Sequence, residues 1–297
     1  NNSQAEIKVF NVIGGYPEDL KQWWNVRNPQ QLHDRIQNER ETFVAGVVER
    51  IKDKGVEKVS SEVRWGKEFV ETTREVWRTS HDLIMVTTRD MKNISKTLFE
   101  CPSRELFLVC PCSLWIAKFK KFGIRTKRII AALPGEGSGH FDLTCDGLSA
   151  KLLDFAALIA KLEGSELHVV HALPKYGARG MKKGRKVRPD LAGFVDDLRT
   201  KLRESCSAIL ADYDLILGQD QVHLLIGNPS DVIPEFANEF GVDLIVMGTA
   251  ARSGIAGIVY GNTAEEVLQE VNCSILAIKP DNFVSPIKLR EKKEATA

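Results

Sequence analysis

The sequence predicts an α/β protein built of two tandem, doubly wound parallel-sheet domains of the Rossmann-like type. Two observations support this fold class: short apolar blocks recur at a nearly constant offset, and apolar runs of strand length alternate with helical patterns. Strands that alternate with helices form parallel sheets with helices on both faces. Ligands of such sheets bind beyond the carboxyl ends of the strands, so we expect a site there.

The offset is the strongest sign of a repeat. Three blocks of the first half return in the second half after 160 or 161 residues: 6–13 at 166–173, 82–84 at 243–245, and 112–118 at 273–279. Each block is short, apolar and contains β-branched residues, as a strand buried on both faces of a parallel sheet requires. Because chance rarely keeps three blocks in register, we interpret the halves as two copies of one unit.

The second unit contains a full set of elements in the expected order. Its predicted strands span 128–133, 167–172, 221–225, 244–248 and 274–279. Its predicted helices span 148–162, 194–211, 232–240 and 263–270, where apolar residues recur three or four positions apart. One predicted helix therefore separates each pair of successive strands.

The first unit lacks a counterpart of the opening strand. Subtracting 161 from Arg128 gives a position before Asn1, so the first strand and the first helix have no equivalent there. The sequence also begins without methionine, and we expect either a fragment or a very divergent first unit. The expected boundaries are a degenerate, N-terminally truncated domain at 1–122, a second domain at 123–285, and a charged tail at 286–297.

Composition and charge argue against several function classes. The 297 residues are 43% hydrophobic and 27% charged, which supplies enough apolar material for two cores. Lysine and arginine total 41 against 40 acidic residues, so no overall charge attracts nucleic acid or a membrane. No apolar run reaches the length of a membrane span, and no signal pattern opens the sequence. We therefore expect a cytoplasmic protein without a membrane or nucleic-acid partner.

Cysteine and histidine show no pattern typical of a metal or catalytic site. The six cysteines lie mostly inside apolar runs, without paired CxxC motifs, and are expected to be reduced thiols. Cys110 and Cys112 flank Pro111 at the start of a predicted buried strand with no histidine nearby, which favours a structural role over redox or metal chemistry. His168 and His171 lie inside a strand and form no constellation with a nucleophile. Neither an enzyme nor a metal protein is expected.

The segment 246–268 (VMGTAARSGIAGIVYGNTAEEVL) runs from a predicted strand through a glycine-containing loop into a helix. Glycines let backbone amides approach a phosphate, and a helix N-terminus offers free N–H groups with a partial positive charge. Thr263 and Glu266 also fit a capping box, in which the helix caps itself. The spacing thus leaves two alternatives, a phosphate site and a self-capped helix that needs no ligand.

The segments 261–265 (GNTAE) and 273–280 (CSILAIKP) resemble a known family, the universal stress proteins, and within it the tandem E-type members. The resemblance covers most of the second unit and, in the first, mainly 80–87 and 102–118. It implies two adenine nucleotide α-hydrolase-like domains. In this family the last strands of the two domains lie side by side, so Leu114–Lys118 and Ile275–Lys279 are expected to pair within the chain as an internal pseudo-dimer.

The same resemblance implies a stress-response function without catalysis and a cleft in the second domain for ATP or another small ligand. The ligand positions carried over from the family are Pro134, Val170, Gly248, Thr249, Ala251, Arg252, Gly261, Asn262 and Thr263. Three of them depart from the family pattern: Pro134 replaces an aspartate that contacts adenine, Ala251 replaces a glycine, and Asn262 replaces serine or threonine. A weakened ATP site is therefore expected.

The first unit has lost the ligand loop, because Thr87, Asp90 and Glu100 stand at the positions of its small residues. It is expected to bind no nucleotide and to serve in the pairing of the domains. In the second unit, Glu265 and Glu266 lie in the first turn of the last helix and would repel a phosphate there.

Two alternatives to a non-enzymatic regulator remain open. A slow ATPase would use the remaining loop, and Pro134 argues against it. A carrier or sensor of a lipid or another anionic metabolite would use a different pocket, with the basic segment 175–188 as an anion clamp. The preferred interpretation of that segment is a solvated loop. Packing in the first unit is the preferred role of Trp23 and Trp24, and a homodimer is a further expectation.

Overall fold

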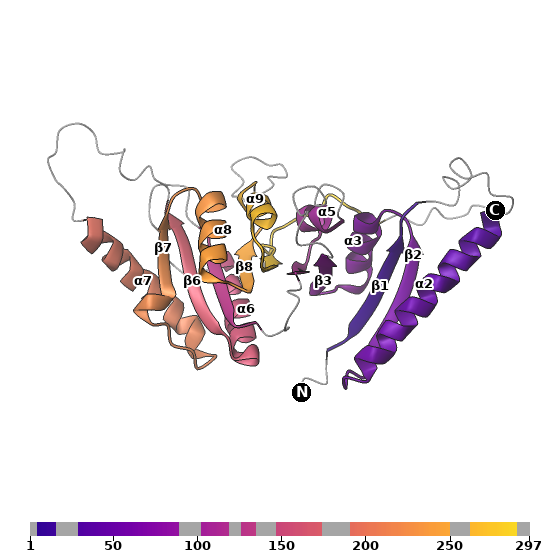
Figure 1. Ribbon diagram of the computed structural model, residues 1–297, viewed down its shortest axis with the longest axis horizontal. Helices are drawn as coiled ribbons and strands as arrows, with labels where there is room; N and C mark the ends of the chain where they lie inside the picture. Colours follow the sequence, from indigo (N-terminus) through magenta and orange to yellow (C-terminus); the bar gives the residue numbers. More distant parts are fainter. Residues whose placement is uncertain are drawn as a thin grey trace. The chain divides into compact units, whose positions relative to one another are not determined.

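The computed structural model describes residues 5–15, 29–88, 102–118, 126–134, 147–173, 191–249 and 262–289. They divide into two compact units (Figure 1), the first made of Asn1–Ser80 with Pro286–Ala297 and the second of His81–Ser285. Both units contain parallel strands joined by helices, which confirms the predicted α/β class.

The first unit is a two-stranded parallel sheet with a helix on each face. It consists of β1 (Ile7–Ile13), α2 (Pro29–Lys52), β2 (Val59–Trp65) and α3 (Glu68–Thr79). On the α2 side, Trp65 stacks on His33 with ring centroids 4.5 Å apart, and its Nε1 donates to Gln37 at 2.7 Å. Successive strand residues point to opposite faces, so Arg64, next to Trp65, faces α3.

The interface between this sheet and α3 is charged. Glu75 of α3 is only 3% exposed and forms ion pairs with Lys8 of β1 and Arg64 of β2. Arg78, one turn further along α3, adds a third cation at 3.2 Å. A carboxylate buried at this depth requires several cationic partners, because its desolvation is costly. The first unit is therefore held together in part by ion pairs where most α/β units have apolar contacts.

The second unit is a seven-stranded sheet in the order β3-β4-β9-β8-β5-β6-β7. Its strands are β3 (Leu83–Thr88), β4 (Ser113–Lys118), β5 (Arg128–Leu133), β6 (Glu166–Leu173), β7 (Val222–Ile226), β8 (Leu244–Gly248) and β9 (Ser274–Ile278). Its helices are α5 (Pro102–Val109), α6 (Gly147–Glu163), α7 (Leu191–Ala211), the short 3-10 helix η2 (Gln219–Gln221), α8 (Pro229–Phe240) and α9 (Asn262–Glu270).

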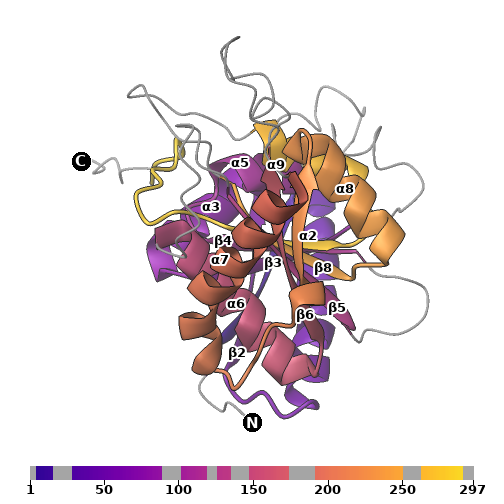
Figure 2. The ribbon, with the colours of Figure 1, turned by 90° about the vertical axis from the view of Figure 1, so that its left-hand side faces the viewer.

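The core of the second unit lies between this sheet and the pair α6 and α7, which Figure 2 shows side by side in front of the strands. Leu152, Leu153, Ala156 and Ala157 of α6 are completely buried. They pack against β5, β6 and β8, and residues of α7, β7 and β9 complete the same core. Every predicted helix and strand of the second domain is present. The opposite face of β6 and β7 is covered by α8.

A pseudo-two-fold axis passes between β4 and β9, the one antiparallel pair among the described strands of this sheet. Trp115 lies opposite Leu276, and the neighbouring pairs are Leu114 with Ala277 and Ile116 with Ile275. Adding the repeat offset of 161 to position 115 gives 276. Trp115 and Leu276 are therefore equivalent residues of the two halves, and because they also pair with each other they lie on the axis. The expected pairing of Leu114–Lys118 with Ile275–Lys279 is thus observed, with the ladder limited to three residue pairs.

Two buried lysines follow the same symmetry. Lys118, at the end of β4, donates from Nζ to the carbonyl oxygens of Leu268 and Val271 at the C-terminus of α9, at 3.3 and 2.6 Å. Lys279, just after β9, donates from Nζ to the carbonyl oxygen of Phe107 in α5, at 2.5 Å. Each lysine therefore binds the C-terminal end of the other half's last helix, where the free carbonyl groups carry a partial negative charge.

The compact units divide the chain at a different place from the predicted domains. The break falls between Ser80 and His81 and not near residue 122, because β3 and β4 join the larger sheet through β9. In the described part of the first half, no strand stands at the position that β5 has in the second, and β1 does not pair with β3. Ile287 belongs with the first unit, where Trp77 Nε1 donates to its carbonyl oxygen at 3.1 Å.

Candidate functional site

The candidate site is the edge of the second unit's sheet where β5, β6 and β8 end. Ala132 of β5 lies beside Met247 of β8 in parallel register. Pro134, which follows β5, and Thr249, which follows β8, therefore come after neighbouring strand ends, with Gly248 between strand and loop. The structure thus brings three of the predicted ligand residues to one edge. The helix α9 begins at Asn262, on the connection from this edge to β9.

Thr249 has a polar group without a partner. Its backbone N–H donates to the carbonyl oxygen of Ile278 at 3.2 Å, which extends the β8–β9 ladder by one bond. The side chain is only 7% exposed, and its Oγ1 is buried with no hydrogen-bond partner among the described residues. A buried hydroxyl without a partner costs about 1–3 kcal/mol, so native structures usually satisfy it.

Packing of α6 on β8 favours a glycine at position 248 independently of any bound ligand. A β-carbon at this position would lie 2.8 Å from Cδ2 of Leu148, in the first turn of α6. Real β-carbons are essentially never found so close to another heavy atom. A larger residue here would require the side chain of Leu148 to move, so the close packing of α6 on β8 favours glycine whether or not a phosphate binds nearby.

Two residues singled out in the sequence, Val170 and Thr263, do not lie where their expected roles require. Val170 is completely buried inside β6, flanked by Ala132 and His223, and does not lie at the strand end. Thr263 lies inside the first turn of α9, which begins at Asn262, so the expectation of Thr263 as the N-cap of that helix is wrong. The start of the helix depends on the preceding loop, which the capping pattern alone does not fix.

Several predicted residues lie outside the described residues. They are Ala251, Arg252 and Gly261 of the loop, the basic segment 175–188, the pair Trp23 and Trp24, and Asp90 and Glu100 of the first half of the chain. The side chain of Asn262 is likewise outside the description. For these positions the expectations drawn from the sequence stay predictions.

The charge of Glu265 is neutralised by a partner. Arg104 of α5 donates from Nε to its carboxylate at 2.7 Å, and a second contact comes from Nη2. This carboxylate is therefore less able to repel an anion at the start of α9 than its position in the sequence suggested. The arginine comes from the equivalent helix of the other half, since the offset of 161 converts position 104 into 265.

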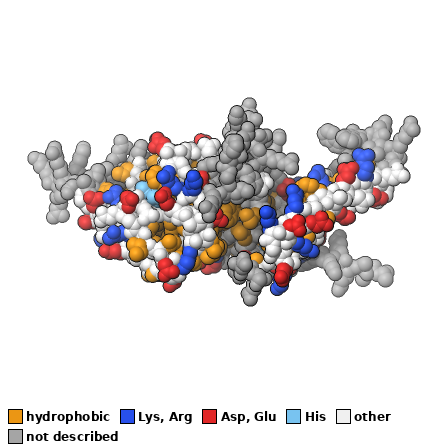
Figure 3. Space-filling view, turned by 60° about the horizontal axis from the view of Figure 1, so that its bottom comes forward, with side chains coloured by type: hydrophobic (Ala, Val, Ile, Leu, Met, Phe, Trp, Pro, Cys, Tyr) orange, Lys and Arg blue, Asp and Glu red, His pale blue; other side chains and the backbone are white. Residues whose placement is uncertain are grey.

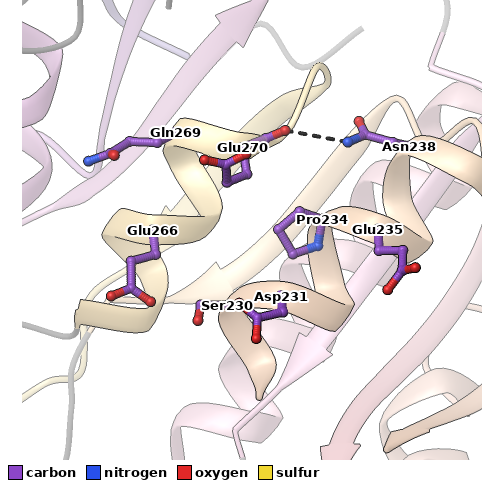
Figure 4. A pocket seen from close by; sticks show the side chains of 8 residues that line it. All are labelled: Ser230, Asp231, Pro234, Glu235, Asn238, Glu266, Gln269 and Glu270. Atoms are coloured by element: carbon purple, nitrogen blue, oxygen red, sulfur yellow. Dashed lines mark hydrogen bonds between the residues drawn. The ribbon is translucent and has the colours of Figure 1, made fainter. Parts of the chain in front are cut away.

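A groove of about 520 Å³ lies between α8 and α9 (Figure 4). It is lined by Ser230, Asp231, Pro234, Glu235, Asn238, Glu266, Gln269 and Glu270. At the C-terminal ends of the two helices, Asn238 Nδ2 donates to the carbonyl oxygen of Glu270 at 3.4 Å. Four of the eight side chains are carboxylates and none is cationic, so the groove disfavours a phosphate. None of the predicted ligand residues lines it.

A histidine pair lies on the α8 side of β6 and β7. His168 Nδ1 and His223 Nε2 are 3.1 Å apart, and the rings of Phe236 and Phe240 pack against them. Burial lowers the pKa of both histidines, that of His223 to about 4. These two histidines were not predicted to lie together, although each lies near the start of a predicted strand, which was the available signal. No group of three potential metal ligands occurs among the described residues.

The surface charge is mixed, and the described helices lack the features of a membrane span. On the face shown in Figure 3, acidic and basic side chains are interspersed, in keeping with the formal charge of +1. Within the described ranges, no helix combines the length and the apolar character that crossing a membrane requires.

The comparison with protein families gives one match. Residues 146–279 match the model of the universal stress protein family. These residues include α6 to β9, and with them the described part of the candidate site except Pro134.

Relatives in several bacteria are similar over most of the chain. Universal stress protein E of Escherichia coli strain K12 is 25% identical over 293 residues, which cover 98% of this chain and 90% of that protein. The Universal stress protein E homolog of Haemophilus influenzae is 23% identical over 287 residues, which cover 94% of this chain and 88% of that one. The similarity to these proteins therefore extends across both units.

Solved structures resemble the whole chain as well. A candidate universal stress protein from Pseudomonas aeruginosa UCBPP-PA14 is 22% identical with a TM-score of 0.60, covering 95% of this chain and 96% of that chain. A universal stress protein from Archaeoglobus fulgidus DSM 4304 is 17% identical with a TM-score of 0.61, covering 94% of this chain and 87% of that chain. At such identities the likeness concerns the fold, and it confirms the predicted α/β class.

Proposed function

We propose that this chain, whose residues 146–279 match the universal stress protein family, is a non-enzymatic stress-response protein with a reduced cleft for ATP or another small anionic ligand. The cleft lies at the carboxyl ends of β5, β6 and β8, where doubly wound sheets bind their ligands. The first unit has a structural role. Location in the cytoplasm and formation of a homodimer stay predictions from the sequence.

The buried hydroxyl group of Thr249 is the main observation in support of this proposal. Its Oγ1 is buried at the end of β8 and has no partner among the described residues. A phosphate or ribose oxygen that accepts a hydrogen bond from this hydroxyl would remove the cost of leaving it unsatisfied. The N-terminus of α9, on the connection that follows, would add N–H groups for the same anion.

The proposal of a reduced affinity rests on Pro134. This residue follows β5, at the place where the resemblance predicts a carboxylate for adenine, and it is exposed. Proline has neither a side-chain donor nor an acceptor, and its nitrogen has no hydrogen to donate. Recognition of a base is therefore poor, and the affinity for a nucleotide comes mainly from its phosphates.

Absence of catalysis is proposed on chemical grounds. Acyl or phosphoryl transfer needs a nucleophile, a base and a group that orients the base, or a metal held by carboxylates. At the described part of this edge the strand ends contribute Pro134, Gly248 and Thr249, and β6 contributes His171, which lies beside Leu133 and is only 4% exposed. Threonine and histidine side chains are present, but among the described residues no third side chain that orients the histidine accompanies them. Binding without turnover is the function that such a site supports.

Native mass spectrometry of the full chain with Mg-ATP tests the proposal. We expect the wild type to form a one-to-one adduct of nucleotide mass, Thr249→Val to bind about tenfold more weakly, which corresponds to about 1.4 kcal/mol, and Gly261→Glu to bind none. Ser207→Ala serves as the control, since its hydroxyl is bonded to Arg203 in an exposed part of α7 and should leave the affinity unchanged.

Other results would contradict parts of the proposal. Equal binding by the wild type and both cleft variants would move the site elsewhere. ATP hydrolysis that disappears in Thr249→Val would make the protein an enzyme. Co-purification of a lipid or another metabolite in place of a nucleotide would favour a carrier.

A further inference from the structure

Two thiols lie in contact in the short connection between α5 and β4. Cys110 follows the last residue of α5 and is completely buried, and Cys112 precedes β4 and is half-buried. Their Sγ atoms are 3.5 Å apart, with Pro111 between them in the chain. The pair has one solvent-facing member and one protected member, and neither has a place in the proposed ligand cleft.

A buried cation lies next to this pair. Lys279 is only 3% exposed and is fixed by its hydrogen bond to the carbonyl oxygen of Phe107. Burial lowers its pKa to about 8, while the thiols of Cys110 and Cys112 act in the opposite direction. The interaction is mutual, because a cation near a thiol favours the thiolate, which is the reactive form.

The contact between the two thiols shifts their pKa values in opposite directions. The hydrogen bond from Cys112 lowers the pKa of Cys110, and Lys279 adds to that effect. The same contact raises the pKa of Cys112, since loss of its proton would place two negative charges side by side. The pair therefore loses its first proton more easily than its second, and the resulting negative charge is shared between the two sulfur atoms once that proton has left.

We propose that Cys110 and Cys112 are a redox-active pair that closes to an intramolecular disulfide on reaction with a low-molecular-weight disulfide. The inference is independent of the ligand cleft. It rests on the contact between the two sulfur atoms, the partial exposure of Cys112 and the fixed ammonium group of Lys279. It also revises the purely structural role that the sequence favoured for this pair.

The chemistry proceeds in two exchange steps. The remaining proton moves across the sulfur–sulfur contact to Cys110, and the Cys112 thiolate attacks the reagent RS–SR, forming a mixed disulfide and releasing RS⁻. Cys110 then attacks the Cys112 sulfur, and its proton passes to the second departing RS⁻. Two protein thiols are oxidised, and one RS–SR is reduced to two thiols. A disulfide across a single residue is strained, so reduction should reverse it readily.

The second half of the chain contains an internal control. By the offset of 161, Cys273 is equivalent to Cys112 and Lys118 to Lys279, and Lys118 binds the carbonyl oxygen of Leu268 as Lys279 binds that of Phe107. The position equivalent to Cys110 is Val271, which has no thiol. The two halves therefore share the lysine and differ in the second sulfur.

Thiol trapping in glutathione buffers tests the proposal on the reduced full chain. After quenching with N-ethylmaleimide and digestion with trypsin, the segment 105–118 contains Cys110 and Cys112 and no other cysteine. We expect oxidised glutathione to convert it from the doubly alkylated form to an unlabelled form lighter by two hydrogen atoms than the free dithiol. The segment that contains Cys273 should keep its single label at the same buffer ratio.

Variants separate the roles of the three residues. Cys110→Ser should stop at a glutathione adduct on Cys112, and Cys112→Ser should give no disulfide. Lys279→Met should move the pH profile of thiol alkylation to higher pH, and Lys279→Arg should largely restore it. Circular dichroism on each variant excludes unfolding as the cause.

Three results would overturn the proposal. The first is a segment 105–118 that stays doubly alkylated in the wild type at ratios that modify Cys273. The second is a disulfide from Cys110 or Cys112 to another cysteine. The third is an alkylation profile that Lys279→Met leaves unchanged in a folded protein, which would remove the lysine from the mechanism. The wild-type measurement needs no variant, so a variant that fails to fold does not weaken it.

Discussion

His168 and His223 are held uncharged by their surroundings. Burial is the largest cause for each, and the neighbouring imidazole and Arg199 further lower the pKa of His223. Glu166 and Asp220 act in the opposite direction, although the carboxylate of Glu166 is 3.9 Å from His168 Nε2 and makes no hydrogen bond with it. Because the rings of Phe236 and Phe240 cover the pair, a proton added here would be poorly solvated.

This arrangement predicts acid sensitivity of the second unit. A histidine whose pKa is lower in the folded state than its ordinary value of 6.5 binds its proton more readily after unfolding, so stability falls as the pH drops below 6.5. The loss continues to about pH 4, the folded pKa of His223. We expect about 1–2 kcal/mol between pH 7 and pH 5 in urea unfolding, and a smaller loss in His223→Gln. Equal pH dependence in wild type and variant would contradict this account.

Single residues were predictable where strand ends determine them. Pro134, Gly248 and Thr249 meet at one edge because each follows or ends a strand whose bounds the apolar pattern gave. Val170 was placed in the cleft by analogy, and the structure buries it within β6. The histidine pair depends on the pairing of β6 with β7, and a single sequence does not reveal which strands are neighbours.

At the scale of elements, α3 shows an unusual way of attaching a helix to a sheet. Glu75 lies between cations from β1, β2 and its own helix, with Lys8, Arg64 and Arg78 as partners. Removing one partner of such a group leaves the others charged in a poorly solvated place. Glu75 therefore connects α3 to both strands of the sheet through its ion pairs, and Glu62 of β2 also contacts Lys8 and Arg64.

Glu75→Gln should therefore destabilise the first unit by about 3 kcal/mol in urea unfolding, because its three cationic partners lose their most buried anion, while the more exposed Glu62 stays beside two of them. Glu39→Gln is the matched control. Glu39 pairs with Arg35 one turn away on α2, and both side chains are largely exposed, so its loss should cost no more than about 0.5 kcal/mol. Comparable losses in the two variants would show that the network of Glu75 contributes little.

The elements of the second domain followed from the sequence almost residue by residue. Strands β5 and β8 have the predicted bounds, because their apolar runs are flanked by turn formers and charged residues. The helices α7 and α8 each begin three residues before the predicted start. In α8 the first turn is Pro229, Ser230 and Asp231, which suit a helix N-terminus but interrupt the apolar spacing used to find it.

At the scale of the whole molecule, the two halves meet around the axis between β4 and β9. Beside this axis, Arg104 and Glu265 occupy equivalent positions in α5 and α9 and bind each other. Replacing Arg104 by glutamate would set two carboxylates against each other in a partly buried place. The pair thus links α5 of the first half to α9 of the second.

A charge-reversal cycle tests this contact. Arg104→Glu should destabilise the second unit, and the double variant Arg104→Glu with Glu265→Arg should recover most of the loss. We expect a coupling of about 1–2 kcal/mol from urea unfolding of the four proteins. Additive effects of the single changes would mean that the contact does not contribute to stability.

The division into compact units was the least predictable feature of the molecule. Repeats at one offset correctly indicated two copies, and equal copies imply a boundary near their midpoint. Among the described strands of the first half none takes the place that β5 has in the second, and β4, which pairs with β3, joins the larger sheet through β9. Which sheet a strand joins depends on the strands that can pair with it, and the order of the strands along the sequence does not determine those partners.

The contact between Arg104 and Glu265 also bears on the history of the two halves. In a dimer of identical subunits, a residue beside the axis meets its own copy, so a favourable ion pair cannot form there. Once both copies are encoded in one gene, each position can mutate alone, and opposite charges become available. A second domain produced by itself would place Glu265 against Glu265. Divergence after duplication would thus have made the halves unable to separate again into interchangeable subunits.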